Sequence, residues 1–171
     1  MTKEQEFIGH ISKNKGILYK VCNSYCKRKA DREDLAQEII FNLWKSFGTY
    51  RDEYKFSTWM YRIALNVAIS YYRQVRKIQY KEMPPAKIFI FEDNPEVKRD
   101  RDTKLGLLER FINDLSETDK PIILLYLDDR SHREIAEITG YTETNVATRI
   151  NRIKERLRTN FKKIGNHHGT E

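Results

Sequence analysis

The sequence predicts an all-α protein with two small helical domains that are joined by a flexible linker. Apolar residues recur at steps of three and four over long stretches, which is the period of an amphipathic helix. The 171 residues include only seven Gly and four Pro, and the alternation that is typical of strands is scarce. The helical period breaks where most of the prolines lie. We therefore expect a domain over 1–80, a linker over 81–104, a domain over 105–163 and a tail over 164–171.

The charge balance points to a polyanionic partner. Charged residues make up 33% of the chain, the net charge is +7 and the pI is about 9.3. Such a balance favours nucleic acid first and an acidic membrane surface second. A hydrophobic content of 39% is enough for folded cores. No apolar run approaches the ~18 residues of a membrane-spanning helix, and the N-terminus lacks the layout of a secretory signal. We therefore expect a cytoplasmic protein without membrane insertion.

Residues 4–29 are expected to form the first helix, with Gly16 weakening its middle. Its apolar residues share one face: Phe7, Ile11, Leu18, Cys22 and Tyr25. Cys22 and Cys26 lie one helical turn apart, so a disulfide between them would close almost no loop. No further Cys or His stands at the spacing of a zinc site. We interpret the pair as buried thiols in a reducing compartment, and a metal or redox-sensing role is the less favoured alternative.

The second helix is expected to begin at the acidic residues 31–34, which suit a first turn, and to end at Gly48. Its buried stripe comprises Leu35, Ile39, Leu43 and Phe47. The opposite side carries Gln37, Glu38, Phe41 and Lys45. Phe41 has two explanations: it broadens the core stripe, or it belongs to a docking face for a protein partner.

A third helix is expected over 58–77, with Ser57 as its cap. Its inward residues are Met60, Ile63, Ala64, Val67 and Tyr71. One outward line carries basic and hydrogen-bonding side chains: Arg62, Asn66, Ser70, Arg73 and Lys77, with Arg76 close by. Aromatic residues crowd beside it: Phe56, Trp59, Tyr61, Tyr71 and Tyr72. Cations beside aromatic rings suit single-stranded nucleic acid. Aromatics at helical spacing are more often core residues, and we expect at least Trp59 to be partly buried.

The second domain is predicted to begin with a helix whose apolar residues are Leu105, Leu108, Phe111, Ile112 and Leu115. Residues 116–119 offer a cap for the next helix, in whose first turn Pro121 is tolerated. Residues 122–127 are apolar nearly all round, so we expect this helix to be central. The apolar segment 88–91 within the linker is expected to pack on a neighbouring domain or a partner.

A helix-turn-helix is predicted next. Ser131 and Glu134 have the spacing of a capping box, Gly140 ends the short helix that follows, and Thr142 can cap the next one. That next helix buries Val146, Ile150, Ile153, Leu157 and Phe161. Its other side carries the row Asn145, Thr148, Arg149, Arg152 and Arg156. A second helix with a basic face is sized for a major groove. The alternative is an ordinary helical hairpin with a solvated basic face.

Three stretches carry a family resemblance. Residues 34–44 read DLAQEIIFNLW and are like the segment DLxQExFxxxW. Residues 56–66 read FSTWMYRIALN and are very close to FxTWLYRIAxN. Residues 134–152 contain EIAEITG and VATRINR and are like EIAxxxG…VxxRxxRA. In this order and spacing they resemble the extracytoplasmic-function (ECF) group of sigma-70 family RNA polymerase sigma factors. The resemblance covers about residues 5–80 and 105–160.

The resemblance implies a role for each surface. The first domain would be like sigma region 2 and the second like region 4. The second helix would dock on the clamp coiled coil of the polymerase β′ subunit through Asp34, Gln37, Glu38 and Phe41. The third helix would bind and melt the −10 promoter element through Arg62, Asn66, Ser70, Arg73, Arg76 and Lys77. The recognition helix would read the −35 element through Asn145, Thr148, Arg149, Arg152 and Arg156.

The implied partners are core RNA polymerase, through its β′ clamp and β subunits, and promoter DNA. The linker would run toward the RNA exit channel. An anti-sigma factor is common in the family. Three residues depart from the family pattern: Ala147 often corresponds to a basic residue, Ile153 to an Ala and Asp129 to a Gly. These departures bear on the −35 contacts and not on the fold.

Two other functions are weaker hypotheses. A stand-alone helix-turn-helix transcriptional regulator would use the second domain, but it leaves Phe41 and the basic line of the first domain without a purpose. An enzyme acting on nucleic acid would need a clustered acidic pair, a metal-spaced His or Cys group or an activated nucleophile. The sequence offers none, and the neighbouring His167 and His168 lie in a frayed tail. We expect no catalytic residue, metal or cofactor.

Overall fold

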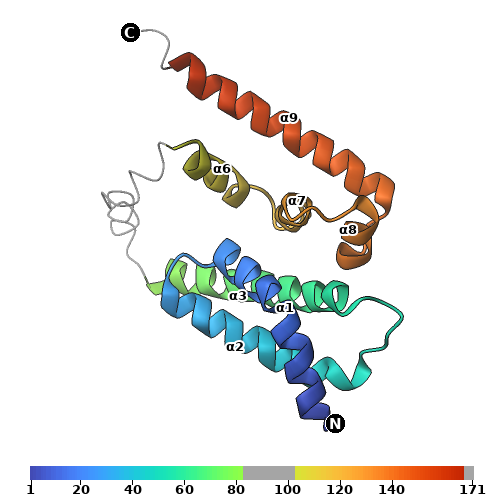
Figure 1. The fold of residues 1–171 in the computed structure, drawn as a ribbon. Coiled ribbons are helices and arrows are strands. Elements are labelled where there is room, and N and C mark those ends of the chain that lie inside the picture. The colour runs from blue at the N-terminus through green and yellow to red at the C-terminus, as the bar shows by residue number, and fades with distance from the viewer. Residues whose placement is uncertain (83–102, 168–171) are drawn as a thin grey trace. The chain divides into compact units, whose positions relative to one another are not determined.

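The computed structural model describes residues 1–82 and 103–167, with side-chain detail for 1–75 and 103–165 (Figure 1). These residues form helices and no strand, so the all-α prediction is confirmed. The chain divides into two compact units, Met1–Glu82 and Met83–Glu171. The predicted packing of residues 88–91 and most of the predicted linker lie outside the described residues. None of the described helices is long and apolar enough to cross a membrane.

Helix α1 (Lys3–Tyr25) opens the first unit. Thr2 and Gln5 form a capping box, in which the Thr2 hydroxyl accepts from the Gln5 N–H at 3.2 Å. The helix is interrupted at Asn14, whose φ of −117° and ψ of 15° are not helical, and Gly16 is not the weak point. The Asn14 amide donates to the His10 carbonyl at 2.9 Å, so the side chain competes with the backbone for that acceptor. The helix ends four residues before the predicted position, because Cys26 is extended.

Helices α2 (Lys29–Ser46) and α3 (Phe56–Glu82) pack on α1 and on each other (Figure 1). The short 3-10 helix η1 (Phe47–Thr49) directly follows α2 in the chain. The predicted α2 stripe is confirmed, since Leu35, Ile39 and Leu43 are fully buried and Phe47 is buried. Gly48 does not end α2, because that helix stops at Ser46 and η1 follows.

The predicted start of α3 is wrong by two residues. Helix α3 begins at Phe56, so Ser57 lies within its first turn and does not cap it. Phe56 is buried, and the Lys55 carbonyl accepts from the N–H groups of Thr58 and Trp59. Packing of the Phe56 ring therefore brings the backbone into the helix before the serine. The helix also continues past residue 77 to Glu82.

The second unit contains α6 (Lys104–Asn113), α7 (Asp119–Leu127), α8 (His132–Thr139) and α9 (Glu143–His167) (Figure 1). Its buried core includes Ile122, Ile123, Leu125, Ile135, Ile138, Val146, Ile150 and Ile153. The predicted α9 stripe is buried as far as Ile153, whereas Leu157 and Phe161 are only partly buried. The aromatic rings of Phe111 and Phe161 meet edge to face at 5.2 Å between α6 and α9. Leu105 and Leu127 are exposed, contrary to the prediction that they lie inward, because they stand at the two ends of the α6–α7 segment.

The helix-turn-helix signals are largely confirmed. The Ser131 hydroxyl accepts from the Glu134 N–H at 3.1 Å, and Gly140 ends α8 in the left-handed conformation with φ of 81°. Thr142 caps α9 by accepting from the Asn145 N–H at 3.1 Å. Only half of the predicted capping box forms, because the Glu134 carboxylate pairs with Arg130 at 3.6 Å.

Candidate nucleic-acid and polymerase surfaces

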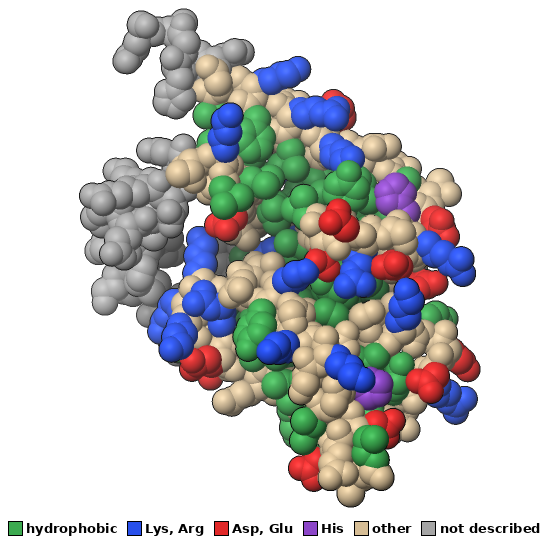
Figure 2. Space-filling model, in the orientation of Figure 1, with side chains coloured by type: hydrophobic (Ala, Val, Ile, Leu, Met, Phe, Trp, Pro, Cys, Tyr) green, Lys and Arg blue, Asp and Glu red, His purple; other side chains and the backbone are tan. Residues whose placement is uncertain are grey.

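On the face shown in Figure 2, basic and acidic side chains are interspersed within each unit. The net charge of +7 therefore does not identify a binding face by itself. The candidate surfaces follow from particular rows of exposed side chains on α2, α3 and α9.

The outer face of α2 combines polar groups with an exposed aromatic ring. Asp34, Gln37 and Glu38 are exposed, and 64% of the Phe41 surface is accessible. Phe41 therefore does not broaden the core stripe. Trp44, one turn further on, is 39% exposed.

Trp44 is held in place at this face by two contacts. The Phe7 ring meets it edge to face at 5.1 Å, and the Lys3 ammonium lies 5.3 Å from the centre of the Trp44 ring. Trp44 was not among the predicted site residues, although its place one turn after Phe41 puts it on the same outer face of α2.

The predicted line on α3 is exposed along its described length. Arg62, Asn66, Ser70 and Arg73 are all exposed, and their spacing places them on one face of the helix. The side chains of Arg76 and Lys77 lie outside the described residues, although the helix itself continues through them. The four described residues thus present cationic, amide and hydroxyl groups in a row.

The aromatic residues near this line are mainly structural. Phe56 and Tyr61 are buried, and Trp59 is half-buried as predicted. His10 stacks on Phe56 with ring centres 4.5 Å apart, and Tyr50 lies 5.1 Å from Trp59. The rings of His10, Tyr50, Phe56 and Trp59 pack together as a cluster at the start of α3, so they are not all available to stack on unpaired bases.

The same cluster anchors the loop before α3. The Tyr50 hydroxyl donates to the Tyr54 carbonyl at 3.0 Å and so closes the loop. Burial, together with the Asp52 carboxylate, raises the pKa of Tyr50 above its ordinary value. Tyr54 is half exposed at this loop and was not predicted as a site residue.

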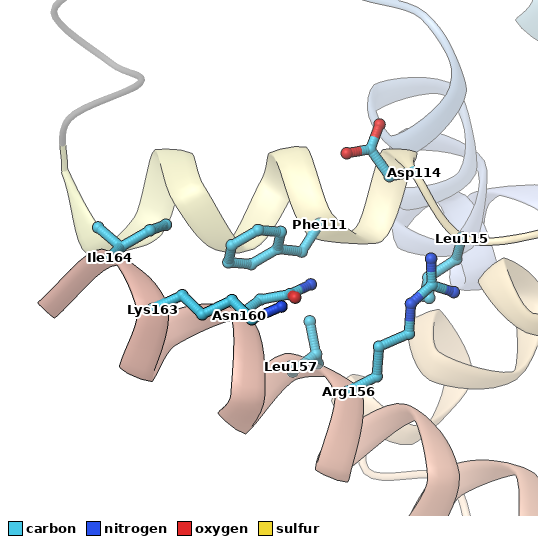
Figure 3. Close-up of a pocket in the computed structure, with 8 residues that line it drawn as sticks. All are labelled: Phe111, Asp114, Leu115, Arg156, Leu157, Asn160, Lys163 and Ile164. Atoms are coloured by element: carbon cyan, nitrogen blue, oxygen red, sulfur yellow. The ribbon is translucent and has the colours of Figure 1, made fainter. Parts of the chain in front are cut away.

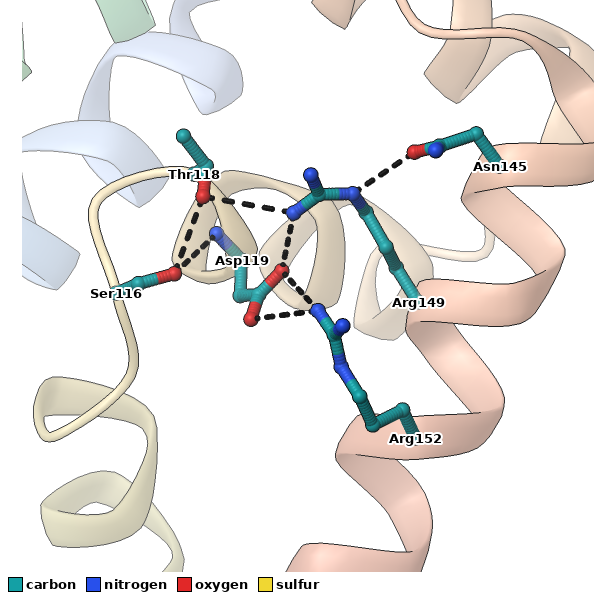
Figure 4. A network of polar contacts seen from close by, with 6 residues as sticks. All are labelled: Ser116, Thr118, Asp119, Asn145, Arg149 and Arg152. Atoms are coloured by element: carbon teal, nitrogen blue, oxygen red, sulfur yellow. Dashed lines mark hydrogen bonds and ion pairs between the residues drawn. The ribbon is translucent and has the colours of Figure 1, made fainter.

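The row on α9 is exposed except at one position. Asn145, Thr148, Arg152 and Arg156 are exposed, whereas the Arg149 side chain is only 23% accessible. The Arg149 Nη1 atom lies 2.7 Å from Asp119 Oδ1, and its Nε donates to Asn145 Oδ1 at 2.8 Å (Figure 4). Arg149 is therefore engaged within the protein to an extent that the sequence did not indicate.

Asp119 also contacts Arg152. The Arg152 Nη2 atom lies 3.3 Å from each carboxylate oxygen of Asp119 (Figure 4). The Asp119 side chain is 11% accessible and stands at the start of α7, where Ser116 accepts from its N–H at 3.1 Å. The sequence prediction treated residues 116–119 only as a cap and so missed this carboxylate.

A pocket of about 270 Å³ lies in the second unit between α6 and α9 (Figure 3). Its apolar wall comprises Phe111, Leu115, Leu157 and Ile164, and Asp114, Arg156, Asn160 and Lys163 complete the lining. Arg156 thus lies at the boundary between the α9 row and this pocket. Among the described residues, no group of His, Cys, Asp or Glu is arranged to hold a metal ion.

The two thiols are buried and unbridged, as predicted. Desolvation by burial, together with the neighbouring Cys26, raises the pKa of Cys22 from 9.0 to about 11. A thiol in such a site is unreactive near neutral pH, because the thiolate is the nucleophile.

Comparison with known proteins gives the family. Residues 10–78 match Sigma-70 region 2, and residues 105–157 match Sigma-70, region 4. The ECF RNA polymerase sigma-E factor of Haemophilus influenzae is 34% identical over 74% of this chain and 72% of that protein. The chain belongs to the ECF group of the sigma-70 family. RNA polymerase sigma factor SigV of Bacillus subtilis is 29% identical over 90% of this chain and 89% of its own length.

Solved structures agree on the fold of this sigma factor. CnrH, in complex with the cytosolic domain of CnrY, aligns with a TM-score of 0.67 at 17% identity over 94% of this chain and 90% of that chain. RpoE of Bartonella quintana, in complex with the anti-sigma factor NepR, aligns with a TM-score of 0.60 at 19% identity over 93% and 96%.

The family also assigns the general function. As an ECF sigma factor, the protein acts in transcription initiation with RNA polymerase, and the family points to a regulator that is not an enzyme. The exposed α2 face and the α3 line lie within the segment that matches region 2. Asp119 and the α9 row lie within the segment that matches region 4.

Proposed function

We propose that this sigma factor brings core polymerase to its promoters by three separate contacts, all of them made by binding without bond chemistry. The observation that carries the proposal is that polar or cationic side chains stand in exposed rows on α2, α3 and α9, within the two matched regions. Two weak DNA contacts add up when one scaffold holds both sites. The protein would do this work in the cytoplasm.

The polymerase contact is assigned to α2. The exposed Phe41 ring, with Asp34, Gln37 and Glu38 around it, would dock on the clamp coiled coil of the β′ subunit. An exposed aromatic ring on a monomer surface gains most by entering a protein interface, where aromatic residues are common anchors. The acidic side chains favour a basic partner surface.

The −10 contact is assigned to α3 and the loop that the aromatic cluster anchors. Arg62, Asn66, Ser70 and Arg73, followed by Arg76 and Lys77, would bind the separated strand. Cations neutralise phosphates, and each unpaired base that stacks on a ring contributes ~1–3 kcal/mol to melting. Because Phe56 and Tyr61 are buried, the partly exposed Trp59 and Tyr54 are the better candidates for base contacts.

The −35 contact is assigned to α9, the second helix of the helix-turn-helix. Its row comprises Asn145, Thr148, Arg149, Arg152 and Arg156. A helix with such a row fits the major groove, where Arg and Asn side chains can bond to purine edges. The α9 row would read duplex DNA while α3 holds the melted segment.

An anti-sigma factor is proposed as a further partner. The two similar structures are of sigma factors in complex with the cytosolic domain of CnrY and with the anti-sigma factor NepR. Their likeness to this chain supports a comparable mode of regulation here.

The test is run-off transcription with core polymerase, this protein and promoter fragments from the region upstream of its own gene. We expect transcripts only when the protein is present, and loss of transcripts when either the −10 or the −35 segment is scrambled. Core polymerase alone is the control. Equal transcription from intact and scrambled fragments would contradict the proposal, and specific binding of the isolated protein that acts without polymerase would favour a stand-alone regulator.

A further inference from the structure

The network at Asp119 joins two helices that are distant in sequence. Asp119 begins α7, and its carboxylate receives one arginine from each of two successive turns of α9 (Figure 4). With 11% of its side chain accessible, this carboxylate is the more buried partner in both ion pairs. The α9 row therefore carries its own counter-ion.

The two arginines are held to different extents. Arg149 makes the short 2.7 Å contact to Asp119, bonds to Asn145 and places its guanidinium 4.6 Å from the centre of the Tyr141 ring. Arg152 shares one nitrogen between the two carboxylate oxygens at 3.3 Å, and 63% of its side chain remains accessible. Arg149 is thus fixed against the protein, whereas Arg152 keeps most of its donor surface open to a ligand.

A carboxylate in this position affects non-specific binding to phosphates and sequence-specific binding to bases differently. Any duplex offers phosphates, and an arginine that binds a phosphate releases counterions whatever the base sequence. A phosphate competes with Asp119 for the same guanidinium donors, because both anions accept paired N–H groups. A guanine edge is uncharged and can be reached by the exposed part of Arg152 while Asp119 remains in contact.

We propose that Asp119 is a specificity-determining residue, which withholds Arg149 and Arg152 from phosphates and so lowers non-specific binding more than −35 recognition. Specificity gained by opposing the wrong complex is a general device of selective interfaces. In this arrangement Arg149 is a positioning residue, and Arg152 is the cation that reads bases. The inference rests on the proposed function, in which α9 contacts the −35 element.

The test uses the full-length protein bound to core polymerase and two promoter duplexes that differ only in the −35 segment, one native and one scrambled. Binding is measured over a series of salt concentrations for wild type and Asp119→Asn, which keeps the shape and one acceptor oxygen but removes the charge. The matched control is Glu137→Gln, which removes the same charge from a carboxylate that pairs with Arg133 on α8 at 3.5 Å.

Asp119→Asn should bind the scrambled duplex about tenfold more tightly at low salt, and the ratio of affinities for native and scrambled duplex should fall by a similar factor. The slope of log affinity against log salt should steepen by about one, the value for one additional phosphate contact. Glu137→Gln should leave the ratio and the slope unchanged.

A uniform loss of affinity with an unchanged slope would overturn the proposal and make Asp119 a purely structural tie. Equal effects of Asp119→Asn and Glu137→Gln would also overturn it, because total charge would then be the cause. If wild type itself shows no preference for the native −35 segment, the proposed function fails first.

A second variant keeps the inference testable if Asp119→Asn does not fold. Arg152→Gln removes the 3.3 Å contacts to Asp119 but keeps the 2.7 Å contact of Arg149. Its melting temperature should therefore fall less than that of Arg149→Ala, while the preference for the native −35 segment should fall about tenfold. Full retention of that preference would overturn the assignment of Arg152 as the reader.

Discussion

Replacing Arg149 by Ala should destabilise the second unit, in addition to weakening −35 recognition. The substitution removes the 2.7 Å contact to Asp119, the 2.8 Å bond to Asn145 and the guanidinium beside Tyr141. It leaves the Asp119 carboxylate, which is 11% accessible, with only the longer contacts to Arg152. An incompletely paired carboxylate in that position costs free energy because its hydration is not restored.

The size of the effect follows from the exposure of the partners. A hydrogen bond to a charged group contributes about 1.5–3 kcal/mol, and the 23% accessibility of Arg149 places this one near the lower end because solvent screens it. The contact with the Tyr141 ring adds about 0.5–1 kcal/mol. The free energy of unfolding should therefore fall by about 2 kcal/mol, which corresponds to a decrease in melting temperature of roughly 10 °C for a unit of this size.

Scanning calorimetry of the full chain measures this effect, with Arg158→Ala as the matched control. Arg158 is on the same helix and pairs with Glu155 at 2.6 Å, but both side chains are exposed. Exposed pairs contribute at most about 1 kcal/mol and often less, so this control should melt within about 5 °C of wild type. Run-off transcription by Arg149→Ala should still fall several-fold when it is measured well below the melting temperature of this variant. Identical melting curves for the two variants would refute the reasoning that the Asp119 network stabilises the unit.

Three further outcomes are expected. Phe41→Ala should weaken binding to core polymerase about tenfold without lowering the melting temperature, whereas Leu43→Ala, at a fully buried site, should cost about 2–5 kcal/mol of stability. A pull-down titration and a thermal melt distinguish the two effects. Undiminished polymerase binding by Phe41→Ala would remove Phe41 from the docking face. Asp129 has φ of 56°, a left-handed conformation that glycine adopts easily and a β-branched residue does not. In urea unfolding, Asp129→Val should therefore destabilise the protein by about 1–2 kcal/mol, while Asp129→Gly should stay near wild type. Equal losses for the two variants would show that the backbone conformation is not the cause. The native state holds the Cys22 proton more tightly than the unfolded chain, since the Cys22 pKa is about 11 against 9.0. The contribution of this thiol to the free energy of unfolding should be complete below pH 9 and decline as the pH rises from 9 to 11. A urea midpoint that does not fall over that interval, relative to the midpoint of Cys22→Ala, would contradict this prediction.

Periodicity and capping chemistry predicted most of the fold. Leu35, Ile39 and Leu43 recur at steps of four, and a stripe of that kind can only be buried against neighbouring helices. Gly140 and Thr142 mark the turn between α8 and α9 because the left-handed conformation and the hydroxyl cap are local requirements. Each of these features depends on a few adjacent residues, so the sequence alone was sufficient.

Features that depend on tertiary packing were predicted less well. The start of α3 was misplaced because the buried Phe56 ring, and not the hydroxyl of Ser57, determines where the helix begins. The interruption of α1 was assigned to Gly16, yet it occurs at Asn14, whose side chain bonds to the His10 carbonyl. In both places the sequence offered two candidate residues, and the contacts of one side chain determine which of the two is correct.

The α9 row shows why a pattern of charge identifies a surface but not its strength. Helical spacing placed Arg149, Arg152 and Arg156 on one side, and all three seemed equally available to DNA when only that helix was considered. The partner that distinguishes them is Asp119, which lies about thirty residues earlier, so no window of helical length contains it. Because this carboxylate offsets part of the positive charge of the row, the row should release fewer counterions on binding DNA than three unpaired arginines would. The affinity of a basic helix for DNA is therefore set by what packs behind it as well as by the cations it displays.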